Sequence, residues 1–388
     1  MSETPKKRII FEGWRFIPHS AAIVLQSYCL SAVRRPDIEV LIRELPFNGP
    51  WSRIGGMFPE ALDRALHTIP VAEAHEPADV VVRIGSPVDL APAPGAERTF
   101  VMASHGAGST VNAPMVGGAN IAEAIAVTPE TMLLTPSAFA RQGLIAQGVP
   151  EDRIAITPRG IDTGFFRPPS DSERENLRER FGWAGEFIFL NVSAMTDNKG
   201  IDRLIRAFAS VLAHYPQARL VLKGVDSIYR SKDRLTGLLR RVPAEIAAAV
   251  EPQITYIGGN YKLVDMTRLY QCADAYVAPY LSEAFCLPVL EAAACGLPAI
   301  CTQGGPTEEF TSDEFALRIG AGWDPTTRTL APDVTHLAQN MAFLLTNAAW
   351  RERARAVLEL RVVVVVFKEP AEQLVMLLGR ARPELARL

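Results

Sequence analysis

From about residue 186 onward, short β-rich runs alternate with helical patterns, and this alternation restricts the fold more than any other feature. The runs lie at 187–192, 218–222, 254–257, 275–278 and 298–301. They are almost entirely apolar, which is typical of parallel strands buried on both faces. Between the first two, apolar residues from Ile201 to Leu212 follow the i, i+3, i+4, i+7 spacing of one helical face. Further helices are expected at 232–250, 263–272 and 288–295. This β-α-β-α order predicts a doubly wound sheet.

The first half of the chain repeats the theme less regularly. Candidate strands lie at 8–11, 39–42, 79–84, 99–103, 122–127 and 153–156. Residues 20–33 form the first expected helix, and the turn-rich stretch 157–169 is the expected linker. Two open α/β domains joined by a linker are expected to face a cleft at the carboxyl ends of their strands, where such sheets bind ligands.

Size and composition agree with two domains and exclude several classes of protein. The chain has 388 residues, against roughly 150 residues for a typical domain. Forty basic and 43 acidic residues give a net charge of −3, which argues against a nucleic-acid partner and gives no support for peripheral membrane contact. The five cysteines lack a C-x-x-C pair, so neither a disulfide framework nor a zinc knuckle is expected. Their pattern instead predicts a protein of a reducing compartment. No secretory signal is apparent, and the aliphatic run near 362–367 is too short to span a bilayer.

Residues 279–298 carry the densest chemical information. Pro288 suits the first turn of a helix, and Gly296 and Pro298 suit its end. The loop 283–287 is then expected at a helix N-terminus, where unpaired N–H groups favour a phosphate. Glu291, expected in the first turn, and Glu283 in the loop would supply carboxylates that accept hydrogen bonds from sugar hydroxyls. A purely structural interpretation stays open, in which Glu291 complements the helix dipole and Glu283 is solvated.

The segment Ser282–Pro298 closely resembles the E-x7-E signature of retaining glycosyltransferases of the GT-B fold, family 4 (glycosyl transferases group 1). Three further segments match in the family's order. Gly160-Ile-Asp162 with Phe166 and Pro168 resembles the linker "G-V-D…F-P". Lys199-Gly200-Ile-Asp202 resembles "K-G-x-D", and Gly304-Gly305-Pro-Thr-Glu308 resembles "G-G-x-x-E". The resemblance covers about residues 100 to 310.

This resemblance implies a GT-B architecture of two Rossmann-like domains. Residues 1–165 would form the acceptor-side domain, 166–368 the nucleotide-sugar-binding domain, and 369–388 a helix that crosses back to the first. The implied activity is that of a cytoplasmic hexosyltransferase. It would move a sugar from a nucleotide-sugar to a hydroxyl of a saccharide or glycoconjugate precursor, with retention of anomeric configuration. The implied enzyme needs no cofactor and no metal.

The resemblance also assigns roles by position. Glu291 would bind the ribose diol, and Glu283 the hydroxyls of the donor sugar rather than act as a nucleophile. The loop Ala284-Phe285-Cys286-Leu287 would bind phosphate and sugar through its amides. Lys199 would neutralise the charge that grows on the departing diphosphate, which is already a good leaving group. Without the motif, Lys199 is equally well a solvated lysine at a helix start.

Residues of the first half are assigned less sharply. His105, just after an expected strand, resembles the family's "S-H" and would contact the donor sugar or the acceptor, whereas a loop histidine is more often structural. His19 is a candidate acceptor-side residue beside Ser20, the expected N-cap of the first helix. Gly13 would let the backbone approach the diphosphate. Arg15, close by, is equally well a surface charge.

Two departures from the family stand out. Ala194 occupies the position of an arginine that shares the donor phosphates with the lysine, and a charged hydrogen bond of that kind contributes about 1.5–3 kcal/mol. Arg15, Lys223 and Arg159 are the candidate replacements. The five valines 362–366 favour a strand where the family enters its last helix.

Two other functions remain as alternatives. The missing arginine gives weight to a catalytically silent GT-B module that binds a saccharide or a nucleotide, or serves as a partner subunit. A nucleotide-sugar epimerase would use the donor without an acceptor.

Overall fold

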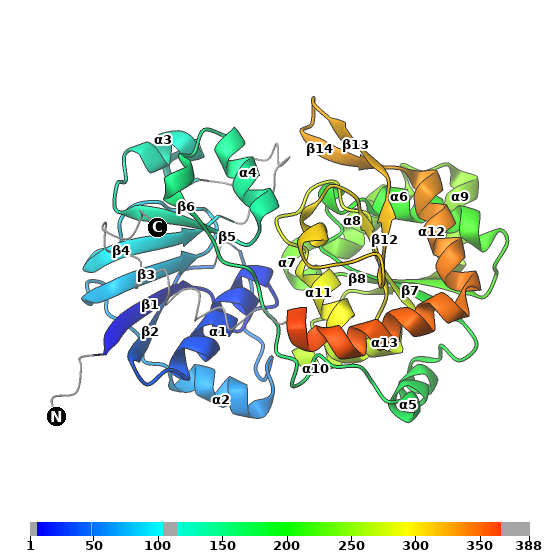
Figure 1. The fold of residues 1–388 in the computed structure, drawn as a ribbon, viewed down its shortest axis with the longest axis horizontal. Helices are drawn as coiled ribbons and strands as arrows, with labels where there is room; N and C mark the ends of the chain where they lie inside the picture. Colours follow the sequence, from blue (N-terminus) through cyan, green and yellow to red (C-terminus); the bar gives the residue numbers. More distant parts are fainter. Residues whose placement is uncertain (1–5, 48, 104–114, 119, 366–388) are drawn as a thin grey trace. The chain divides into compact units, whose positions relative to one another are not determined.

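The computed structural model describes residues 6–47, 49–103, 115–118 and 120–365. They divide into two compact units, which meet in the sequence between Gly160 and Ile161, inside the predicted linker. Each unit contains a six-stranded sheet in which all strand pairs are parallel (Figure 1). The predicted α/β class with two doubly wound sheets is therefore confirmed. The expected C-terminal helix, 369–388, lies outside the described residues.

The first unit holds strands β1 to β6 in the order β2-β1-β3-β4-β5-β6. Their bounds are β1 Lys7–Gly13, β2 Ile38–Glu44, β3 Ala78–Ile84, β4 Ala96–Met102, β5 Thr131–Thr135 and β6 Ile154–Ile156. The connecting helices are α1 Ser20–Val33, α2 Glu60–Thr68, α3 Ile121–Ala126 and α4 Ala138–Ala146. The aliphatic interiors of the strands are buried, as in Ile9, Ile10 and Val80 to Val82, so the sheet is covered on both faces.

One predicted strand of this unit is wrong. Residues 122–127 were expected to form a strand but belong to α3, and the strand in this region is β5, which the sequence did not indicate. Asn120 and Glu123 form a capping box: Asn120 Oδ1 accepts from the Glu123 amide at 2.9 Å, and Glu123 Oε2 accepts from the Asn120 amide at 3.4 Å. This reciprocal cap favours a helix even though Ala and Ile residues also fit a strand.

The second unit holds a sheet in the order β12-β11-β10-β7-β8-β9, with a separate antiparallel hairpin of β13 and β14. The strands are β7 Phe187–Val192, β8 Ala218–Lys223, β9 Ile254–Ile257, β10 Ala275–Ala278, β11 Ala299–Thr302, β12 Ala316–Ile319, β13 Ala321–Asp324 and β14 Thr329–Pro332. The order reverses direction along the sheet between β7 and β10. Open α/β sheets bind ligands beyond the carboxyl ends of their strands at such a point.

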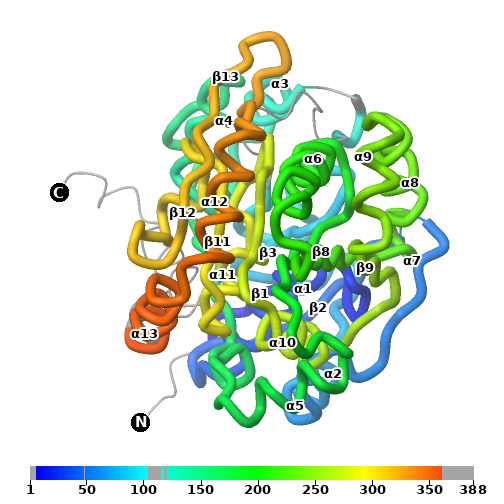
Figure 2. The backbone as a smooth tube through the Cα atoms, turned by 90° about the vertical axis from the view of Figure 1, so that its right-hand side faces the viewer, coloured from blue at the N-terminus to red at the C-terminus, as the bar shows by residue number. Residues whose placement is uncertain are grey.

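Nine helices of the second unit lie within the described range 161–365. They are α5 Asp171–Phe181, α6 Ile201–Leu212, α7 Asp226–Tyr229, α8 Ser231–Leu239, α9 Ala244–Val250, α10 Leu263–Cys272, α11 Leu287–Ala294, α12 Val334–Thr346 and α13 Ala348–Val365. Helices α6, α8, α9 and α12 share one buried core with the sheet, and α6, α8 and α9 lie side by side in Figure 2. Helix α10 contacts α11 and β7, and α11 contacts β10 and β11. None of the described helices has the length and apolar character needed to cross a membrane.

Two expectations about this unit need correction. The single helix expected at 232–250 is broken into α8 and α9, because Pro243 cannot continue a helix and instead sits at the N-cap of α9. The valine run was expected to favour a strand, yet residues 362–365 are the last turn of α13. The Trp350 amide donates to Asn347 Oδ1 at 3.0 Å and so caps the start of that helix. Once a helix is nucleated, each added valine costs only a few tenths of a kcal/mol.

Candidate active site

The loops that follow β7 and β10 are joined at the carboxyl edge of the second sheet. The Leu281 amide donates to the Asn198 carbonyl at 2.8 Å, and Asn198 Nδ2 donates to the Ser282 carbonyl at 3.0 Å. Gly200 has φ +66°, and a Cβ there would lie 1.9 Å from the Pro279 carbonyl oxygen. Only glycine therefore fits this position, and its contact with Pro279 brings residue 199 beside residue 283.

Lys199 and Glu283 form an ion pair between Nζ and Oε1. Their side chains are 24% and 15% exposed, so the pair is largely shielded from solvent. Burial lowers the pKa of Lys199, but the charge of Glu283 and the hydrogen bond to it outweigh burial, and the pKa is raised. Lys199 is therefore fully charged at neutral pH, which its predicted role requires.

The amino end of α11 lies next to this pair in the sequence. Its N-cap, Cys286, is left-handed at φ 65°, and no side chain caps the helix. Within the described part of the chain, the amides of Phe285, Cys286 and Leu287 donate to no other residue. The Phe285 ring stacks on Phe310 at 4.8 Å, which fixes the loop. A left-handed non-glycine residue costs about 1–2 kcal/mol, and an uncapped helix N-terminus with amides that have no protein acceptor is suited to bind an anion.

Glu291 lies one turn inside α11 rather than in its first turn, because the helix begins at Leu287. It is buried, and Tyr270 on α10 donates a 2.6 Å hydrogen bond to its Oε2. Burial raises the pKa of Glu291 to about 7, and the Tyr270 hydrogen bond only partly opposes this. The dipole-complement interpretation of Glu291 is thereby weakened, since its carboxylate lies beyond the first turn and points to α10.

Tyr270 is a member of the site that sequence reasoning missed. Its ring lies 6.3 Å from that of Phe166, and Pro168 is the nearest contact of a Cβ placed at Gly296, at 3.3 Å. The linker residues of the "F-P" motif thus pack against α10 and the end of α11. No local pattern marks Tyr270, because its partners are distant in the sequence.

The "G-G-x-x-E" turn is explained by local packing. A Cβ at Gly305 would lie 2.4 Å from the hydroxyl oxygen of Tyr280, and Glu308 Oε1 accepts from the Gly304 amide at 2.8 Å. Tyr280 follows β10 and leads into the loop that carries Glu283. The turn therefore packs against Tyr280 and helps to hold the loop that carries Glu283.

Where the structure describes the candidates of the first unit, each has a local structural role. His105 lies outside the described residues. A Cβ at Gly13 would meet Leu25 Cδ1 at 2.3 Å and the Ile84 carbonyl oxygen at 2.5 Å, so packing of the unit itself requires this glycine. Arg15 is buried rather than a surface charge, and its Nε donates to Glu44 Oε1 at 2.7 Å. It is already committed to a structural ion pair.

His19, and not Ser20, is the N-cap of α1. Its Nδ1 accepts from the Ala21 amide at 3.0 Å, and its ring stacks at 5.6 Å on Trp51. Burial lowers its pKa to about 4, so the ring is neutral at physiological pH. A neutral Nδ1 is what lets a histidine take the place of the expected serine as a cap.

Lys223 ends β8 and pairs in register with Val192, two residues before Ala194. It is 5% exposed, and its Nζ donates to the carbonyls of Gly224 and Gly259, the latter at 2.8 Å. Burial lowers its pKa to about 8, with Asp226 opposing the shift. Of the three candidate replacements for the missing arginine, Lys223 alone belongs to the unit that holds Lys199 and Glu283.

Neither a reactive cysteine nor a metal-binding cluster is found among the described residues. All five cysteines are free and buried, and burial raises the pKa of Cys286 well above that of an ordinary thiol, so it is not a thiolate nucleophile. In the described part of the chain, no group of three or more His, Cys, Asp or Glu residues is arranged to hold a metal ion.

Comparison with known proteins places this site in a family. The family described as glycosyl transferases group 1 matches residues 173–356, which include Lys199, Glu283 and Glu291. The second unit therefore matches the glycosyl transferases group 1 family over most of its length. The resemblance drawn from the motifs is therefore confirmed, and glycosyltransferases are among the solved structures that share the fold of this chain.

A curated relative of this chain is also a glycosyltransferase. A D-inositol 3-phosphate glycosyltransferase from Acidothermus cellulolyticus is 33% identical over 221 residues, 55% of this chain and 47% of that protein. This chain matches between about a third and a half of the length of such curated relatives.

Solved structures share the whole architecture at low identity. Anabaena Alr3699/HepE in complex with UDP-glucose superposes with a TM-score of 0.70 at 16% identity, covering 96% of this chain and 99% of that one. WaaG, a glycosyltransferase involved in lipopolysaccharide biosynthesis, gives 0.63 at 17% identity, covering 94% and 98%. At such identities the likeness concerns the fold.

Proposed function

We propose that this protein transfers a sugar from a nucleotide-sugar donor to an acceptor hydroxyl, using the site at the carboxyl edge of the second sheet. One observation carries the proposal: the Lys199–Glu283 ion pair lies beside the uncapped amino end of α11, with the Glu291 carboxylate one turn further on. A cation and three free amides suit a diphosphate, and the two carboxylates suit the hydroxyls on either side of it.

The ion pair gives this site a way to respond to the donor. In the free protein Lys199 is neutralised by Glu283. A diphosphate offers Lys199 a stronger anionic partner, and the released Glu283 carboxylate then accepts hydrogen bonds from the sugar hydroxyls. As the bond to the sugar breaks, negative charge grows on the diphosphate, and Lys199 with the α11 amides stabilises it.

The finer features of the reaction are part of the proposal. We expect transfer with retention of configuration, without a metal ion or other cofactor, to a saccharide or glycoconjugate acceptor, in the cytoplasm. UDP-glucose is the first donor to test, because HepE has been solved with it. Lys223 is proposed to supply the second cation in place of Ala194, because it ends the strand next to β7 and its Nζ donates to backbone carbonyls rather than to a carboxylate.

The test is release of nucleoside diphosphate from a panel of nucleotide-sugars, with acceptors added in turn. Lys199→Met is expected to lower kcat/KM by about 10²–10³-fold, the usual effect of losing a charge that stabilises the departing group. Lys232→Met is the matched control, since Lys232 is exposed on α8. Equal turnover in the two variants would overturn the proposal, and the anomer of the product, read by NMR, tests retention.

The silent module remains the second candidate, because Ala194 removes one expected phosphate ligand. It predicts nucleotide binding without turnover for every donor. An epimerase would instead convert the donor sugar with no acceptor present, which the same assay detects by analysing the recovered donor.

A further inference from the structure

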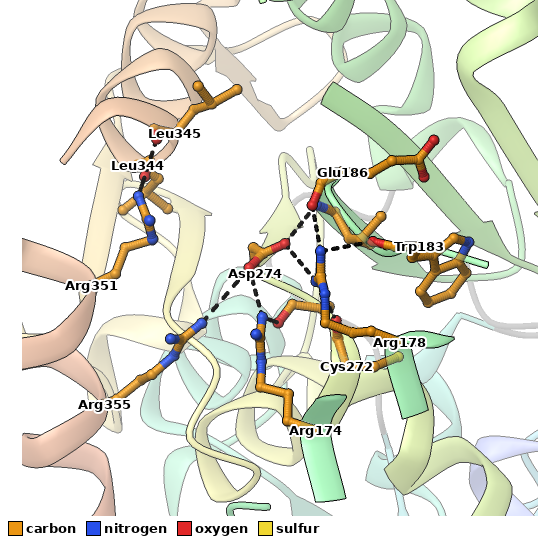
Figure 3. Close-up of polar contacts among 12 residues, drawn as sticks. Arg174, Arg178, Trp183, Glu186, Cys272, Asp274, Leu344, Leu345, Arg351 and Arg355 are labelled. Atoms are coloured by element: carbon orange, nitrogen blue, oxygen red, sulfur yellow. Dashed lines mark hydrogen bonds and ion pairs between the residues drawn. The ribbon is translucent and has the colours of Figure 1, made fainter. Parts of the chain in front are cut away.

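A second concentration of charge lies at the opposite, amino-terminal edge of the same sheet. Asp274 immediately precedes β10, and arginines from two helices converge on it (Figure 3). Arg174 and Arg178 come from α5, and Arg351 and Arg355 from α13. These four side chains form what we call the arginine cluster. Because Lys199 and Glu283 follow strands whereas Asp274 precedes one, the arginine cluster is separate from the candidate active site.

Two of the arginines have their hydrogen bonds satisfied within the fold. Arg178 donates to Asp274 Oδ2 and to the carbonyls of Cys272 and Trp183, each at 2.9 Å. Arg351 donates to the last carbonyls of α12, at Leu344 and Leu345. These contacts give both side chains a structural role.

Arg174 and Arg355 make fewer hydrogen bonds than Arg178 does. Arg174 binds through Nη2 alone, to Asp274 Oδ1 at 2.6 Å and to the Ala273 carbonyl at 3.1 Å. Within the described residues, Arg355 has no hydrogen bond, and its one ion pair, to Asp274 Oδ1, is 3.9 Å long. Asp274 cannot serve it better, because its carboxylate also accepts from Arg178 and from the Ile188 amide at 2.8 Å.

Among the described residues, the arginine cluster therefore carries more positive charge than its acidic neighbours neutralise. Glu186, the other acidic residue in Figure 3, pairs with Arg219. Glu352 acts on Arg351 at longer range. Burial lowers the pKa of Arg355, and repulsion from Arg174, Arg351 and Arg178 lowers it further. Such repulsion destabilises the folded protein unless an anion is present.

We propose that Arg174 and Arg355 bind the phosphate group of a small soluble molecule, at a site that the transfer reaction does not use. Guanidinium groups offer paired N–H donors that match the oxygens of a phosphate. The side chains of Arg174 and Arg355 are only 23% and 32% exposed. Partly buried guanidinium groups of this kind suit a single phosphate group better than a flat membrane surface.

The experiment measures the melting temperature of the full chain in inorganic phosphate and in chloride of equal ionic strength. We expect phosphate to raise Tm by roughly 2–4 °C once its concentration is about ten times Kd. Arg355→Gln should abolish this response and, without phosphate, should melt no lower than the wild type because it relieves repulsion. Arg353→Gln is the control, because Arg353 is exposed on the same helix.

Lys199→Met separates this site from the candidate active site. Its phosphate response should persist, whatever the fate of the proposed transferase activity. A response that is lost in Lys199→Met and kept in Arg355→Gln would overturn the inference, as would the absence of any response in the wild type. Binding to phosphatidylglycerol vesicles that requires Arg355, without a response to free phosphate, would replace the soluble ligand by a membrane and equally overturn it.

Discussion

Lys199 and Glu283 are 84 residues apart in the chain, yet they form one ion pair because their loops share hydrogen bonds through Asn198. The two glutamates of the site differ in environment. Glu283 is paired with a cation, whereas Glu291 is buried against a neutral tyrosine. Burial destabilises a carboxylate that has no charged partner, and this cost is expected to appear in the free energy of unfolding of the protein.

Glu291→Gln is expected to stabilise the protein at pH 8 and to weaken donor binding. The folded pKa of about 7 lies above the unfolded value of 4.5, so Glu291 favours folding below pH 4.5 and this contribution is lost as the pH rises through 7. Glutamine stays neutral, so the variant should gain roughly 1–3 kcal/mol over wild type at pH 8 and little at pH 4.5.

Urea unfolding at the two pH values measures this difference. Glu179→Gln, on the exposed surface of α5, is the control, and its unfolding free energy should stay within about 0.5 kcal/mol of the wild-type value at both pH values. If Glu291→Gln is less stable than wild type at pH 8, the buried carboxylate is better compensated than Tyr270 alone would allow.

The loops after β7 and β10, at the carboxyl edge of the second sheet, meet where Gly200 lies against the Pro279 carbonyl. Gly200 and Gly182 are both left-handed, at φ +66° and +71°. Only Gly200 faces an obstacle, the Pro279 carbonyl, and nothing lies within 4 Å of a Cβ at Gly182. The two positions therefore separate the cost of backbone conformation from the cost of collision.

Alanine substitution at these two glycines tests that distinction. Gly182→Ala should lower the free energy of unfolding by about 1 kcal/mol, the strain of a left-handed alanine. Gly200→Ala should cost roughly 3 kcal/mol or more, because the loops must part, and it should also abolish nucleotide binding. If chemical denaturation gives the same loss of unfolding free energy for both variants, the loops after β7 and β10 can move apart at little cost.

At the scale of the whole molecule, the candidate donor site lies within one unit. Lys199, Glu283, Glu291, Tyr270 and Lys223 all belong to residues 161–365. The unit has its own sheet and its own buried core. Under the proposed function, these residues of the second unit bind the nucleoside diphosphate, and the first unit is proposed to bind the acceptor.

Hydrogen exchange of the full chain with UDP checks this division. Protection is expected in 196–200 and 279–291, where the loops and the α11 amides would close on the diphosphate. Little change is expected in β1 and α1. Protection confined to the first unit would contradict the assignment of the donor site.

The sequence by itself predicted the strands β7 to β11 and the helices 20–33, 201–212 and 263–272, because each follows from local periodicity. The motifs of the resembling family assigned Lys199, Glu283 and Glu291 to one donor site, which stays a prediction. Local patterns misassigned 122–127 and the valine run, where a cap or an upstream nucleus decides between helix and strand. Only the tertiary structure decided which partners each charge has. Tyr270 against Glu291, Glu44 against Arg15 and three arginines against Asp274 are contacts between segments distant in the sequence, and no local pattern brings such segments together.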